Sequence, residues 1–178
     1  MTSQADSRTI LYRVAQQSYG PVLDALGPTV EILNQPSLAD DSLCVIRGVI
    51  PAGVIVPLHS HDDAEDFFII DGTQQVLTES AAGLQWADAR AGDYVRVPPG
   101  TMHAHRNVSG QPAVDLIITT AKMGRFFTEA GRPTDGTPQP PSPEDVERFV
   151  ATALKYGYVM GTPEQNAAVG IELPKFAA

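Results

Sequence analysis

Short strand-like segments recur at even intervals through the middle of the chain, and this regularity is the feature that most limits the possible folds. Each segment is rich in β-branched, aromatic or alternating apolar residues, and each is followed by a turn signal containing Gly, Pro or Asp-Gly. No stretch within residues 42–120 has the period of a helix. Evenly spaced short strands joined by tight turns predict an all-β sandwich or barrel.

The first 41 residues carry two further β-friendly segments. These are ILYRV at residues 10–14 and TVEIL at residues 29–33, with the turn signal Gly20-Pro21 between them. We expect residues 1–41 to supply N-terminal strands that pack on the barrel or pair with a second subunit.

The last part of the chain, residues 132–178, has a different character. It starts Pro-rich and continues with a helix start, in which Ser142 is the N-cap and Pro143 the first helical residue. A second helix start of the capping-box type follows at residues 162–165. The first of these helices has an apolar face formed by Val146, Phe149, Val150, Ala153 and Leu154. We therefore expect a linker and a helical tail after a β-barrel that occupies residues 42–131.

Charge and cysteine content narrow the possible partners and compartment. The net charge is -9 and the sequence pI about 4.7, which argues against nucleic acid and anionic membranes, because both attract Lys and Arg. No apolar run is long enough to span a membrane, and the N-terminal residues have no secretory pattern. The single cysteine, Cys44, lies in an apolar run and is expected to be buried and unreactive. These features predict a cytoplasmic protein.

All 4 histidines of the chain fall into two H-x-H pairs. In an extended strand, residues i and i+2 point to the same face, so His59 and His61 can aim at one point, and so can His103 and His105. Glu65 follows the first pair across a short turn and can return to that point. Neutral imidazole and carboxylate suit first-row transition metals. This pattern predicts a metal site.

The spacing around these residues resembles the two sequence motifs of the cupin superfamily. The first motif, G-x5-H-x-H-x3-E-x6-G, spans residues 53–72, and the second, G-x5-P-x-G-x2-H-x3-N, spans residues 92–107. The resemblance implies a double-stranded β-helix, or jelly-roll, barrel. It also implies one divalent transition metal ion (Fe, Mn, Ni, Co or Zn) held inside by His59, His61, Glu65 and His103.

Other residues are candidates for catalysis or for the substrate pocket. Glu65 could act as a base as well as a ligand. His105 should face the same side as His103, where a catalytic base, a substrate contact and a buried polar core group are all open interpretations. Arg47 could point into the barrel or outward, and both orientations stay open. The residues expected to line the substrate pocket are Arg47, Phe67, Met102 and Phe126.

The resemblance is to single-domain, quercetin-dioxygenase-like cupins, and it implies a dioxygenase that acts with dioxygen on a small enolisable or phenolic compound. One alternative is an oxygen-independent, metal-dependent isomerase, decarboxylase or hydrolase. Another is a non-enzymatic small-molecule-binding protein, because the fold alone does not choose among these functions. The resemblance and the N-terminal strands also suggest a homodimer.

Overall fold

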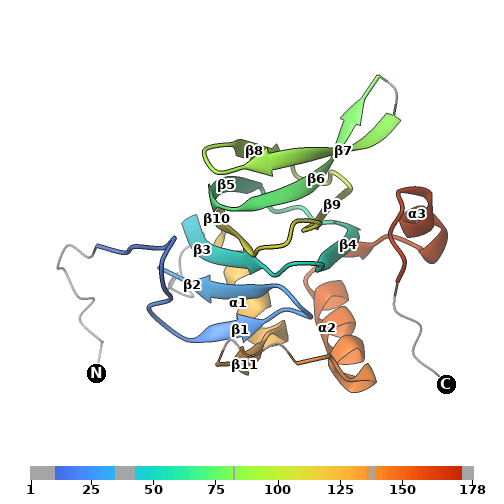
Figure 1. The fold of residues 1–178 in the computed structure, drawn as a ribbon. Coiled ribbons are helices and arrows are strands. Elements are labelled where there is room, and N and C mark those ends of the chain that lie inside the picture. The colour runs from blue at the N-terminus through green and yellow to red at the C-terminus, as the bar shows by residue number, and fades with distance from the viewer. Residues whose placement is uncertain (1–10, 35–42, 82, 136, 138, 174–178) are drawn as a thin grey trace.

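The protein consists of two antiparallel β-sheets with helices beside them, as seen in a computed structural model (Figure 1). The structure describes residues 11–34, 43–81, 83–135, 137 and 139–173. Within these residues the larger sheet has the order β11 (Arg132–Thr134), β1 (Val22–Asp24), β2 (Thr29–Ile32), β3 (Leu43–Ile50), β10 (Ala113–Thr120), β5 (Glu65–Asp71) and β8 (Tyr94–Val97). The smaller sheet has the order β12 (Val159–Met160), β4 (Ile55–Ser60), β9 (His103–Arg106), β6 (Thr73–Ser80) and β7 (Gly83–Arg90). The predicted all-β class is confirmed.

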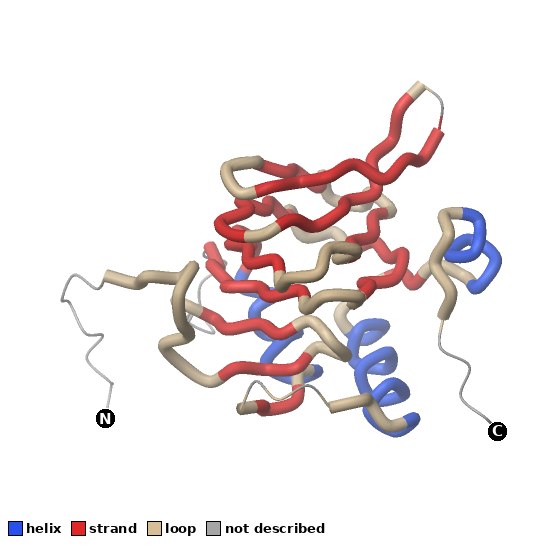
Figure 2. Tube along the Cα trace, in the orientation of Figure 1, coloured by secondary structure: helices blue, strands red, loops and turns tan. Residues whose placement is uncertain are grey.

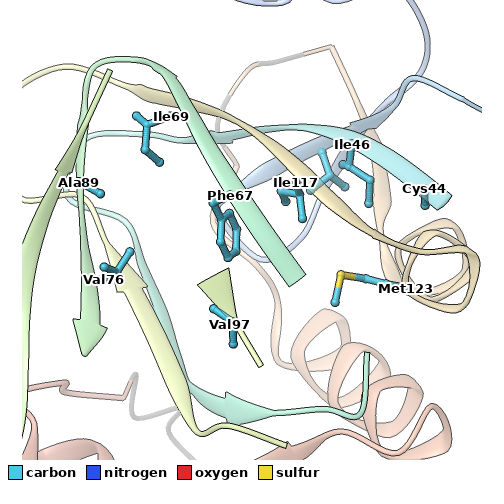
Figure 3. Close-up of a cluster of buried hydrophobic side chains, with 10 residues drawn as sticks. Cys44, Ile46, Phe67, Ile69, Val76, Ala89, Val97, Ile117 and Met123 are labelled. Carbon is cyan, nitrogen blue, oxygen red and sulfur yellow. The ribbon is translucent and has the colours of Figure 1, made fainter. Parts of the chain in front are cut away.

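The two sheets meet in an apolar core, and period-two alternation decides which side chains enter it. In β3, Cys44 and Ile46 are buried, whereas Val45 and Arg47 are only partly covered. Figure 3 shows these inward side chains together with Phe67 and others from both sheets. Burying each large apolar side chain contributes roughly 1.5–3 kcal/mol. Cys44 is buried as predicted, and burial raises the pKa of its thiol to about 11, so the thiol stays protonated at neutral pH.

The N-terminal segment adds to the larger sheet. β2 pairs with β3, and β1 pairs with both β2 and β11. The strand predicted at residues 29–33 is confirmed by β2. The strand predicted at residues 10–14 is wrong for residues 11–14, which form a loop and a turn, and residue 10 lies outside the described part of the chain.

Three helices lie beside the stacked strands in the described residues (Figure 2). They are α1 (Ala121–Ala130), α2 (Pro143–Lys155) and α3 (Pro163–Ala168). Both predicted helix starts are confirmed, with Ser142 and Thr162 as N-caps in capping boxes. The apolar face of α2 packs against α1, except that Leu154 is 59% exposed. No helix in these residues is long and apolar enough to cross a membrane.

Candidate metal centre

Strand ends bring the predicted metal ligands together inside the barrel. His59, near the end of β4, is the direct cross-strand neighbour of His103, the first residue of β9. Their ring centroids are 4.2 Å apart, and that of His61 is 5.0 Å from His103. Glu65 opens β5, and the turn after His61 returns the chain to the cluster. His61, Glu65 and His103 are each at most 5% exposed.

Backbone carbonyl groups orient the three imidazoles. Nδ1 of each ring lies within hydrogen-bond distance of the carbonyl oxygen of a residue two positions away. The pairs are His59–Pro57 (2.8 Å), His61–Asp63 (3.1 Å) and His103–Thr101 (2.7 Å). Because a carbonyl oxygen only accepts, each Nδ1 must carry the proton, which leaves the Nε2 lone pair free. Histidines that bind metals are oriented by the same kind of contact.

The charges in the cluster also suit a cation. Oε2 of Glu65 lies 3.2 Å from Nε2 of both His61 and His103. Burial raises the pKa of Glu65, but the close imidazoles of His103 and His61 outweigh this and hold it below its usual range. Burial, followed by repulsion from His103, lowers the pKa of His59 to about 3. A neutral imidazole and an ionised carboxylate are the forms that bind metal.

The donor set therefore fits a divalent transition metal ion. Ligand atoms of His59, His61 and His103 lie within 4.8 Å of one another, and so do those of Glu65, His103 and His105. The two overlapping groups share His103, and they contain every residue that was predicted as a ligand. Three imidazoles and one carboxylate leave coordination positions for a substrate or for water on an octahedral ion.

His105 differs from the other three histidines. It is 3% exposed, and neither ring nitrogen has a hydrogen-bond partner among the described residues. Its ring lies 5.6 Å from that of His103 and 4.5 Å from that of Phe67. Burial, followed by the nearby His103, lowers the pKa of His105 to about 3, so the ring is neutral at pH 7. A neutral, unpaired imidazole has a lone pair that can accept a hydrogen bond from a bound molecule.

A cavity of about 200 Å³ gives access to this side of the cluster. It reaches His103 and His105, and its walls include the apolar side chains of Val76, Val95 and Val97. Pockets for drug-sized ligands are larger, about 300–1,000 Å³, so the cavity suits a small molecule. A more open depression of about 460 Å³ near Arg132 is lined by none of the four histidines.

Among the residues predicted to line the pocket, Phe67 lies beside the cavity, since its ring contacts His105. The inward orientation of Arg47 is wrong. Because Cys44 and Ile46 occupy the inward positions of β3, Arg47 faces outward, where its Nε donates to the carbonyl of Val14 at 2.6 Å.

The placement predicted for Met102 is also wrong. It packs on the outer face of the smaller sheet, near Leu58 and Ile171. Met102 and Ala104 are two residues apart and so point to this outer face, whereas His103 between them points inward.

Phe126 is likewise not a wall of the cavity. It lies on α1 and stacks on Tyr158 at a centroid distance of 4.5 Å. It therefore lies next to the histidine cluster only through Tyr158, a residue that no sequence pattern singled out.

Tyr158 is the site residue that sequence reasoning missed. Its ring lies 4.9 Å from that of His61 and nearly parallel to that of His59, at 6.3 Å and 11°. Burial raises the pKa of Tyr158, and the charges of Glu65 and Asp63 raise it further. The residue lies nearly a hundred positions after His59, and no motif marks it; only the turn signal at Gly157 precedes it.

Comparisons with known proteins agree with this architecture. Residues 46–119 match the family model of the cupin domain. The cupin domain of Cnp3 from Schizosaccharomyces pombe superposes with a TM-score of 0.51 at 14% identity, over 64% of this chain and 74% of that one. KdgF from Halomonas sp. superposes with a TM-score of 0.50 at 14% identity, over 65% of this chain and 94% of that one. At these identities the likeness concerns the fold.

DMSP lyase DddQ from Ruegeria pomeroyi DSS-3 is 31% identical over 46% of this chain, with a TM-score of 0.40. The match covers 39% of the length of that lyase. No curated protein matches the chain.

Proposed function

We propose that the cupin domain within residues 46–119 is a metal-dependent enzyme whose metal ion is held by His59, His61, Glu65 and His103. The observation that supports this most is the orientation of the three imidazoles. Each Nδ1 is paired with a backbone carbonyl, and Nε2 of both His61 and His103 lies 3.2 Å from a carboxylate oxygen of Glu65. A metal ion bound there supplies Lewis-acid chemistry to a substrate oxygen and, if it is redox-active, access to dioxygen.

The residues around the cavity favour a small enolisable or phenolic substrate. Val76, Val95 and Val97 offer apolar walls, and Phe67 adds an aromatic surface beside His105. Neutral His105 has an unpaired ring nitrogen that can accept a hydrogen bond from the hydroxyl group of an enol or phenol as the substrate binds. We therefore propose a dioxygenase acting on a compound of this kind.

Elemental analysis followed by oxygen uptake tests this function. We expect one transition metal ion per chain, and dioxygen consumption when the protein is given flavonols, β-diketones or catechol-like acids. Purified protein without metal, or turnover that is equally fast under argon, would refute the dioxygenase. The same assay after chelation and after restoring the metal shows whether uptake depends on the ion.

A second function, oxygen-independent catalysis by an isomerase, decarboxylase or hydrolase, is favoured by one observation. His105 is unpaired and buried beside the candidate metal centre, and an imidazole in that place can orient a substrate by a hydrogen bond in reactions that need no dioxygen. Product formed under argon identifies this class. Stabilisation by a ligand without turnover identifies a binding protein instead.

Variants test the ligand set directly. His61→Ala and Glu65→Ala should each lose most of the bound metal while the barrel still folds, because the core of both sheets is unchanged. Asp66→Ala is a matched control, since Asp66 is next to Glu65 but lies on the opposite face of β5, where it is only partly buried. Stoichiometric metal in both ligand variants, measured by elemental analysis with circular dichroism as the folding check, would overturn the assignment.

A further inference from the structure

The hydroxyl of Tyr158 is a buried polar group without a function in the fold. The side chain is 6% exposed, and its oxygen makes no hydrogen bond to any residue that the structure describes. Its ring is nevertheless held tightly, between Phe126 on one side and the imidazoles of His59 and His61 on the other. Buried hydroxyl groups nearly always have partners, and an unpaired one destabilises the protein.

The tail is attached to β4 in a way that sets the position of Tyr158. β12 pairs with β4, so that Met160 lies opposite His59. The amide of Gly161 donates to the carbonyl of Leu58 at 2.7 Å. Asn166, which is fully buried, accepts from the amide of Leu58 at 3.0 Å. The strand that carries His59 is therefore the same strand that anchors Tyr158.

Gly161 shows how close this attachment is. A Cβ atom at this position would lie 2.9 Å from both Cβ and the carbonyl oxygen of Leu58. The segment after α2 thus packs against β4 at backbone contact distance, and Tyr158 is part of the wall of the candidate metal centre rather than a loosely attached surface residue.

We infer that Tyr158 is a positioning residue, whose hydroxyl donates a hydrogen bond to the anionic or oxygen ligand that occupies an open position of the metal centre. This inference rests on the proposed metal site, but not on the proposed reaction. A phenol hydroxyl is a good donor, and a substrate oxygen or small anion is an acceptor. The bound molecule provides the partner that the protein lacks, and this contact orients the molecule against the cluster.

Binding of azide to the cobalt-loaded protein tests the inference without any substrate. The visible absorption of Co²⁺ reports azide binding, and elemental analysis reports the metal. Tyr158→Phe should keep the full amount of metal and bind azide roughly tenfold more weakly, which corresponds to about 1.4 kcal/mol. Tyr156→Phe is the matched control and should leave azide binding unchanged, because the Tyr156 hydroxyl is already paired with Glu129 at 3.0 Å.

Equal azide affinity in Tyr158→Phe and the native protein overturns the inference. Loss of metal in Tyr158→Phe also overturns it, since Tyr158 would then be a ligand. A native protein that binds no Co²⁺ refutes both this inference and the proposed function. A protein that binds metal and azide but consumes no dioxygen refutes the dioxygenase alone, and the comparison of variants still decides the role of Tyr158.

Thermal unfolding of the metal-free proteins provides a second readout. Because the hydroxyl has no partner in the described fold, its removal should leave the melting temperature of Tyr158→Phe equal to or above that of the native protein. A clear decrease would show that the hydroxyl stabilises the fold, and it would refute the positioning role.

Discussion

Replacing Asp115 by Asn should stabilise the protein more at pH 8 than at pH 5. Asp115 points inward from β10 and is 2% exposed. Oδ2 accepts a hydrogen bond from Nε2 of Gln74 at 3.0 Å, whereas Oδ1 has no partner among the described residues. Opposite it on β3 is Gly48, where a Cβ atom would lie 2.3 Å from Oδ1. The carboxyl group of Asp115 is thus buried with one hydrogen-bond donor, Nε2 of Gln74, among the described residues.

The sign of the effect follows from the shifted pKa. Burial raises the pKa of Asp115 from 3.8 to about 7, against the opposing hydrogen bond from Gln74. The native state therefore holds this proton more tightly than the unfolded chain does. The resulting stability is fully present below pH 3.8 and is lost as the pH rises to about 7. At about 1.36 kcal/mol per pH unit, the loss is at most about 4 kcal/mol.

The Asp115→Asn variant would avoid this loss because an amide does not ionise. The NH₂ group of the new side chain could also donate to Oε1 of Gln74, which has no partner in the part of the chain that the structure describes. We expect the gain in the free energy of unfolding over the native protein to be about 3 kcal/mol larger at pH 8 than at pH 5, because about two of the pH units over which stability is lost lie between these two values.

Urea unfolding of both proteins at pH 5 and pH 8, with metal removed, measures the free energy of unfolding. Asp88→Asn is the control. Its exposed carboxylate is paired with Gln75 and Arg90, which lower its pKa, so the variant should differ from the native protein equally at both pH values. If Asp115→Asn also gave the same difference at pH 5 and pH 8, the reasoning on Asp115 would be refuted.

Two further predictions concern the site and the tail. His105→Gln should keep its metal, because no carbonyl orients His105 as one does each other imidazole. It should lose about 100-fold in turnover, because the imidazole that orients the substrate is gone; metal loss on elemental analysis would instead make His105 a ligand. Gly161→Ala should lower the free energy of unfolding by about 1–3 kcal/mol, because its Cβ would press against Leu58. Gly110→Ala, with open space around the new Cβ, should change the free energy of unfolding little. Equal urea midpoints for the two glycine variants would contradict the close packing of Gly161 on Leu58 of β4.

Much of the fold and the candidate ligands could be predicted from local patterns in the sequence. Strand signals and turn signals act over a few residues, so the all-β class and both helix starts were recognisable without long-range information. The spacing of His59, His61 and Glu65 crosses one turn, and His103 belongs to a second segment with the same local form. The structure brings these four residues together.

The rest depended on side-chain direction and on contacts distant in sequence. Alternate side chains of β3 point to opposite faces of the sheet, and the sequence pattern alone does not say which of the two sets enters the core. The orientation of Arg47 depends on that choice. Met102 was misplaced because one residue of offset moves a side chain to the other face of a sheet. Phe126 was misplaced because it lies on α1, where it packs on Tyr158 rather than beside the cavity. Tyr158 reaches the histidines only through the pairing of β12 with β4. The sequence by itself thus determined the residue types and local geometry of the candidate metal centre, whereas the tertiary structure decided what surrounds it, because the walls come from segments joined only by packing.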